Sequence, residues 1–151
     1  MSGGDAVIRA VARLLIAPAL MVAAALMVKG YVDVGDGFSA GVVVSLGIAL
    51  GYVGYGASGI EQALPVLRRA PALMVCGLLL ALATGFFPLL WGGQPFSHRP
   101  GPGQDVATVG SLELFTPLLF DVGVFLLVVG VLTVLLHQMV GAIDWDDEAR
   151  S

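Results

Sequence analysis

The chain has 151 residues, of which 58% are hydrophobic and 12% are charged. Ordinary soluble domains carry about 25% charged residues, so this composition indicates a membrane protein rather than a soluble domain of the same length. The seven basic residues form no stripe and the net charge is -4, which gives no reason to expect a nucleic-acid partner. The lone cysteine, Cys76, excludes a disulfide framework and a thiol metal site.

Four apolar segments account for most of the chain. They cover residues 8–28, 38–55, 72–91 and 118–140. Each is near the length of about 20 residues that a helix needs to cross a bilayer. No clear cleavage site follows the first segment, so we interpret it as a retained span rather than a signal peptide. The prediction is an all-α integral membrane protein with four transmembrane helices in residues 1–143, no soluble domain, and an acidic C-terminal tail at 144–151.

Basic residues predict the orientation of these spans. With four spans, the N-terminus, the connection at 58–70 and the C-terminus share one side of the membrane. Five of the seven basic residues fall on that side: Arg9, Arg13, Arg68, Arg69 and Arg150. Because Lys and Arg accumulate in cytoplasmic segments, we expect both termini in the cytoplasm. We expect Arg9 and Arg13, at the start of the first span, to extend toward the interface.

The connection into the second span is rich in glycine and contains two acids. Gly35-x-Gly37-x-x-x-Gly41 resembles a dinucleotide fingerprint, but no strand precedes it and no βαβ unit is present. We therefore expect a tight, conformationally permissive start to the second helix. Asp33 and Asp36 lie on the same predicted side as Asp121. Together these three carboxylates are candidates for a cation-attracting mouth of an ion path.

Small residues recur at helical spacing within three spans. Such residues let membrane helices approach closely, within one chain or between chains. The set comprises Gly47, Gly51 and Gly54 in the second span, Gly77, Ala81 and Gly85 in the third, and Gly123 and Gly130 in the fourth.

The fourth span carries one acid near its start. Thr116 is a favourable N-cap and Pro117 suits the first helical position, so we expect the helix to begin here. Asp121 then lies roughly 6 Å inside the span. A carboxylate inside a membrane helix indicates a functional site by default, here an ion path or a polar contact with another subunit. The alternative is plain stabilisation by the N-terminus of its own helix and by interfacial water.

No catalytic arrangement can be identified, so we expect neither enzymatic activity nor a cofactor. His98 and His137 fall on opposite predicted sides of the membrane and cannot share a metal. For His137 we expect an interfacial position or an interaction with the C-terminal dipole of its helix.

The four-span frame and two short motifs resemble the B subunit of Mrp-type multisubunit cation/proton antiporters. The family pattern Gly-His-x-x-Pro-Gly-Gly-Gly-Phe-x-Gly-Gly corresponds to residues 30–41. Gly30, Gly35, Gly37, Phe38 and Gly41 match it, whereas Tyr31, Val34, Asp36 and Ala40 depart from it. The second motif, Thr-Pro-Leu-Leu-Phe-Asp-Val-Gly-Val at 116–124, supplies Thr116, Pro117, Phe120 and Gly123. The resemblance covers about residues 8–140.

The resemblance implies an accessory subunit of a hetero-oligomeric complex in a prokaryotic plasma membrane. Such a complex exchanges Na⁺ or another monovalent cation for H⁺ and serves pH and salt homeostasis. The implied partners are the other membrane subunits. A homologous subunit of a membrane-bound hydrogenase or other redox-driven complex, and a purely structural subunit, are the alternatives. A lone four-helix transporter is disfavoured, because such proteins carry a carboxylate in the first span and residues 8–28 have none.

Overall fold

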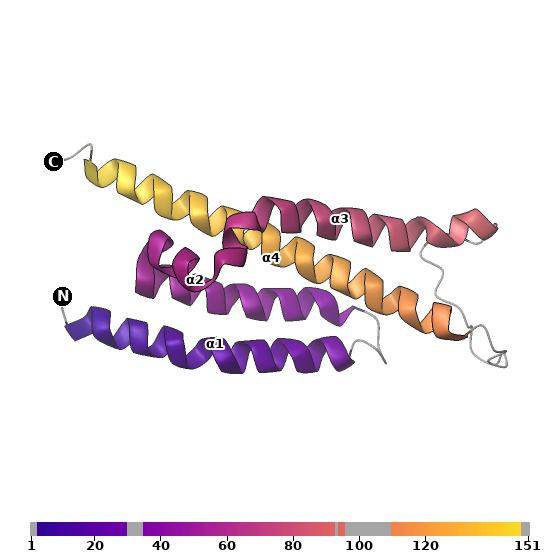
Figure 1. Cartoon of the computed structure of the whole chain (residues 1–151), viewed down its shortest axis with the longest axis horizontal. Coiled ribbons are helices and arrows are strands. Elements are labelled where there is room, and N and C mark those ends of the chain that lie inside the picture. The colour runs from indigo at the N-terminus through magenta and orange to yellow at the C-terminus, as the bar shows by residue number, and fades with distance from the viewer. Residues whose placement is uncertain (1–2, 30–34, 93, 96–109, 149–151) are drawn as a thin grey trace.

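Four helices lie side by side in a row in the computed structural model, which describes residues 3–29, 35–92, 94–95 and 110–148. They are α1 (Gly3–Lys29), α2 (Asp36–Ala63), α3 (Ala70–Phe86) and α4 (Gly110–Glu148), with short 3-10 helices η1 (Pro65–Arg69) and η2 (Phe87–Trp91). The order across the row is α1, α2, α4, α3, so α1 packs mainly on α2, and α3 mainly on α4 (Figure 1). Along the helix axes, the start of α1 and the end of α4 lie at the same end of the molecule (Figure 1).

The prediction of an all-α protein with four apolar helices is confirmed. Within the described ranges, four segments are long and apolar enough to cross a membrane: Ala6–Lys29, Asp36–Ala63, Pro65–Leu90 and Leu118–Gly141. The third combines η1, α3 and most of η2. The division into a membrane domain at 1–143 and a tail at 144–151 stays a prediction, although α4 continues as helix as far as Glu148.

Glycines bring α2 close to α1, as their spacing predicted. A Cβ atom added at Gly47 would lie 3.4 Å from the Ala19 side chain, and one at Gly54 would lie 3.3 Å from that of Ala12. Both contacts are within the chain. At Gly47 and Gly54 the small-residue face of α2 is therefore filled by α1 of the same subunit, whereas Gly51 meets the Ile60 side chain of α2 itself.

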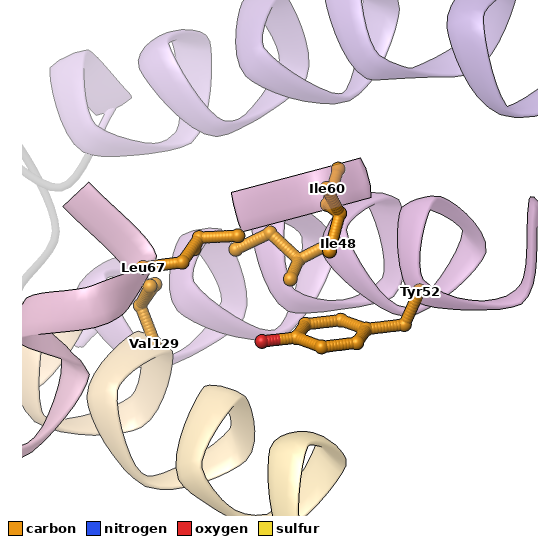
Figure 2. Close-up of a cluster of buried hydrophobic side chains, with 5 residues drawn as sticks. All are labelled: Ile48, Tyr52, Ile60, Leu67 and Val129. Carbon is orange, nitrogen blue, oxygen red and sulfur yellow. The ribbon is translucent and has the colours of Figure 1, made fainter. Parts of the chain in front are cut away.

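A bend at Gly56 ends the straight part of α2. Gly56 has φ 71° and ψ 173°, a conformation that is essentially restricted to glycine. The chain then turns back, so that Ile60 covers Gly51 and is only 1% exposed. The predicted second span ended at residue 55, just before this bend, whereas the apolar helical segment continues to Ala63. The core cluster beside it comprises Ile48, Tyr52, Ile60, Leu67 and Val129 (Figure 2).

The α3–α4 interface is built on small residues from both helices. A Cβ at Gly123 would come within 2.7 Å of the backbone nitrogen of Ala81, and one at Gly77 within 2.6 Å of the carbonyl oxygen of Gly123. A Cβ at Gly130 would likewise meet the backbone of Met74. Because backbone faces backbone, even an alanine at these positions would force the two helices apart.

The predicted start of the fourth helix at Thr116 and Pro117 is wrong. α4 begins at Gly110, so Asp121 lies about three turns inside it. The preceding residues include Leu112, Glu113 and Leu114, which favour helix formation. A proline within such a helix is tolerated where neighbouring groups satisfy the freed backbone carbonyl. The apolar stretch itself still starts at Leu118, as expected.

Candidate functional site

Asp121 is the most deeply buried charged residue among those the structure describes, at 1% exposure. The backbone N–H of Gly35 donates to both oxygens of its carboxylate, with N···O distances of 3.2 Å to Oδ1 and 3.3 Å to Oδ2. Gly35 immediately precedes α2, so the acid of α4 lies against the start of another helix. Asp121 therefore joins two segments that are 86 positions apart in the sequence.

The start of α2 suits an anion. Helix N-termini carry unpaired N–H groups and the positive end of the macrodipole, which together favour a carboxylate. Gly35 itself has no side chain to cap the helix, and its φ of 120° lies in the region that favours glycine. This conformation confirms the expected permissive start of the second span. The alternative of stabilisation by the N-terminus of the acid's own helix does not match this position, because Asp121 lies well inside α4 and its carboxylate contacts the start of α2 instead.

Two further glycines let α2 reach α4 at this point. A Cβ at Gly37 would collide with the backbone carbonyl of Asp121. A Cβ at Gly41 would lie 2.9 Å from the Cβ of Val128 and 3.3 Å from the carbonyl oxygen of Phe125. The glycines of the motif thus set the distance between the helices, which keeps the Gly35 N–H within reach of the carboxylate.

Asp36, the second acid proposed for an ion path, is paired with a cation. Its Oδ2 lies 3.4 Å from Nζ of Lys29, and the Asp36 side chain is 21% exposed. Because Asp36 follows Gly35, whose N–H contacts Asp121, both acids lie at the same end of the helices. Asp33 and Gly30 lie outside the described residues. The structure thus describes a buried acid next to a paired one, and an open mouth of three carboxylates stays a prediction.

The remaining residues of the two motifs take different positions. The Phe38 side chain, on α2, is 58% exposed. Phe120, which directly precedes Asp121 in α4, is partly buried. Gly123 lies in the α3–α4 interface. Thr116 and Pro117 are part of α4, but their side chains are outside the described set.

A second group of polar side chains lies at the other end of the helices from Asp121. Nδ1 of His137 is 2.8 Å from Oε1 of Glu61, and Nε of Arg68 is 3.7 Å from Oε2 of the same carboxylate. His137 was expected to be interfacial or to interact with its own helix dipole, and the interfacial position stays a prediction. The structure adds a partner, Glu61, which the bend at Gly56 turns back toward α4. Sequence reasoning missed Glu61, because nothing local predicts where the chain after the bend lies.

Two buried hydroxyls were also missed. Oγ1 of Thr133 and the Tyr52 hydroxyl are out of contact with solvent and have no hydrogen-bond partner among the described residues. Thr133 is 1% exposed and Tyr52 is 3% exposed. The Tyr52 ring lies between α2 and the ribbon of α4 (Figure 2). In the sequence they are visible only as polar residues within apolar runs. Such a residue costs free energy only if its hydroxyl is buried without a hydrogen bond, which the sequence does not show.

These features define a multi-pass α-helical membrane protein with a buried acid at a junction of two helices. Among the described side chains, no group of three metal-ligating residues lies close enough to hold a metal ion. The family model described as "Domain related to MnhB subunit of Na+/H+ antiporter" matches residues 7–134. The chain belongs to this family.

Curated relatives agree with this assignment. The chain is 33% identical over 112 residues to the B subunit of a Na(+)/H(+) antiporter from Alkalihalophilus pseudofirmus, an alignment covering 74% of this chain and 76% of that relative. It is 28% identical over 141 residues to the "Putative antiporter subunit mnhB2" of Staphylococcus saprophyticus, covering 93% and 98%. It is also 36% identical over 126 residues to a probable K(+)/H(+) antiporter A/B subunit of Rhizobium meliloti. That match covers 81% of this chain but spans only 12% of the relative.

Proposed function

We propose that this chain is an accessory subunit of a multisubunit cation/proton antiporter and that Asp121 takes part in the exchange. The names of the relatives support the antiporter rather than the redox-driven complex. One of them is named for Na⁺ and another for K⁺, so the proposal specifies a monovalent cation and H⁺ only. The other membrane subunits of the complex are the partners.

The arrangement of the helices supports a role within an assembly. Because the helices form a row, both broad faces and the outer side of α1 are open to lipid or to neighbouring subunits. Apolar side chains along α1 such as Leu14 and Met21 are each 74% exposed. The internal glycine faces, by contrast, are filled within the chain and carry no argument for partners.

The contact between Asp121 and Gly35 is the observation that carries the proposal. A charged carboxylate accepts a hydrogen bond worth about 1.5–3 kcal/mol, against about 0.5–1.5 kcal/mol for a neutral group. When Asp121 binds a proton or a cation, its hydrogen bond from the Gly35 N–H weakens, which loosens the contact between the start of α2 and α4. Charge at Asp121 is in this way coupled to the position of α2, which relates ion exchange to a movement of this subunit.

The proposed location is the plasma membrane of a prokaryote, with both termini in the cytoplasm. The start of α1, which carries Arg9, and the end of α4 lie at one end of the helices (Figure 1), and Arg68 lies on the side of this end, because it shares the Glu61 carboxylate with His137 of α4. The opposite end, with Asp121 and Gly35, then faces the outside.

Copurification tests the proposal of an accessory subunit. We expect the affinity-tagged chain to bring down larger membrane subunits in mild detergent, and the purified chain alone to show no cation-driven proton flux in liposomes. Vesicles from cells that lack only this subunit should lose exchange. Robust exchange by the chain alone would refute the proposal.

A further inference from the structure

A cavity lies between the first turns of α1 and the bend in α2. Its volume is about 310 Å³, and it is lined by Ile8, Arg9, Val53, Gly54, Tyr55 and Gly56. The two glycines shape the cavity differently. Gly54 lets α2 approach α1 closely along one side, because a Cβ there would lie 3.4 Å from the Cα of Arg9, whereas Gly56 turns the chain away at positive φ and has open space around it.

Arg9 gives this cavity its chemistry. The Nε atom of Arg9 is out of contact with solvent and has no hydrogen-bond partner among the described residues. The Arg9 backbone carbonyl is fixed by a hydrogen bond from the Tyr55 hydroxyl at 3.3 Å, so α1 is held against α2 beside the cavity. Arg9 as a whole is only partly buried, so its guanidinium is shielded at Nε but not enclosed. A cation held at a cavity without a charged partner among the described residues favours an anion beside it.

A phosphate group fits this donor. The planar guanidinium of arginine binds phosphate oxygens bidentately. Because Nε is shielded from solvent, the terminal nitrogens are the donors that would meet the phosphate. Arg9 stands near the start of the apolar span Ala6–Lys29, from where a long basic side chain can extend to the headgroup region of a bilayer. The side chains next to the cavity on the outer surface are apolar, with Ile8 41% and Val53 71% exposed. They give acyl chains a surface beside the phosphate, which favours a lipid over free phosphate.

We propose that the cavity binds the phosphate of an anionic phospholipid, held by Arg9. Arg13, one turn further along α1, provides a matched control. It carries the same charge on an exposed surface and does not line the cavity. The proposal does not depend on the transport role of the chain, since lipid binding can be measured without any exchange assay.

Native mass spectrometry of the full-length chain, purified with the subunits that accompany it, tests this site. Preparations would be equilibrated with phosphatidylglycerol or phosphatidylcholine. We expect wild type and Arg13→Gln to retain phosphatidylglycerol preferentially, and Arg9→Gln to lose about tenfold or more in retention, the factor that one charge-assisted hydrogen bond contributes. If the Arg9→Gln variant does not accumulate, the wild-type protein alone tests the proposal, which requires it to retain phosphatidylglycerol in preference to phosphatidylcholine.

Three results would overturn the proposal. The first is equal retention of phosphatidylglycerol by the Arg9→Gln and Arg13→Gln variants. The second is a wild-type protein with no preference between the two lipids. The third is Arg9-dependent binding of inorganic phosphate that displaces phosphatidylglycerol, which would assign the cavity to free phosphate.

Discussion

Both carboxylate oxygens of Asp121 accept a hydrogen bond from the backbone N–H of Gly35, at 3.2 and 3.3 Å. This contact fixes α4 to the start of α2 and places a buried charge where a helix dipole favours it. The acid is therefore stabilised by tertiary structure, about three turns away from the start of its own helix. Anything that changes the distance between α2 and α4 changes this contact.

The contact predicts that Gly37→Ala destabilises the protein. The new Cβ would collide with the backbone carbonyl of Asp121, which cannot move aside as a side chain can. We expect a loss of about 1–3 kcal/mol in stability, the usual cost of overpacking, seen as a lower melting temperature of the purified complex. Gly141→Ala is the control, because a Cβ at Gly141 has open space around it. Equal melting temperatures for the two variants would contradict the close approach.

The bend at Gly56 predicts a second sensitive glycine. Its φ of 71° and ψ of 173° are strained for any residue with a Cβ, so Gly56→Ala should cost about 1–3 kcal/mol. We also expect the segment after the bend to loosen, which exposes Ile60. A cysteine introduced at Ile60 in a Cys76→Ser background should react with a thiol reagent faster in the Gly56→Ala variant. An unchanged rate would mean that packing alone holds this segment.

Thr133 predicts a stabilising substitution. Its hydroxyl is buried without a partner among the described residues, so Thr133→Val, which keeps the shape, should raise stability by about 1–3 kcal/mol. Thr133→Ser keeps the hydroxyl and removes a methyl group, and should lower stability instead. Thermal unfolding of both variants measures the difference. A lower melting temperature for Thr133→Val would show that the hydroxyl holds a water molecule or an ion.

The topology predicts a labelling pattern. In a Cys76→Ser background, a cysteine at Gln104 should react with a membrane-impermeant reagent applied to intact cells, because the connection between the third and fourth spans is expected outside. A cysteine at Ala63, near the bend of α2, should react only after the membrane is permeabilised. The reverse pattern would invert the proposed orientation, and with it the side from which Asp121 is reached.

The lengths of the apolar runs and the spacing of the glycines predicted the helices well. Apolar length predicted four spans, which the structure contains, although the second apolar helix continues past the predicted end at residue 55 as far as Ala63. Glycine spacing correctly marked the faces on which helices pack, although it gave no partner for each face. The Gly35 start was predicted from its sequence context, since only glycine readily takes a φ of 120°.

Tertiary contacts account for what the sequence did not predict. Thr116 and Pro117 carry strong start signals, yet α4 begins at Gly110, about two turns earlier, in a segment of helix-favouring residues. Glu61 meets His137 only because the chain reverses at Gly56, and Asp121 meets Gly35 only because α2 and α4 are neighbours in the row. Pairings between distant segments depend on the order of the helices, which hydropathy does not encode.

The direct test of the account is Asp121→Asn, studied in one membrane preparation for both subunit content and cation-dependent proton flux. Asparagine keeps the size and one acceptor oxygen but removes the charge and the exchangeable proton. Because that oxygen can still accept the hydrogen bond from Gly35, we expect the subunit to assemble at the normal level while exchange falls. Wild-type flux at normal subunit content would contradict a role in exchange and leave Asp121 as a structural acid. Loss of the subunit from the complex would contradict it as well, by assigning the charge to assembly.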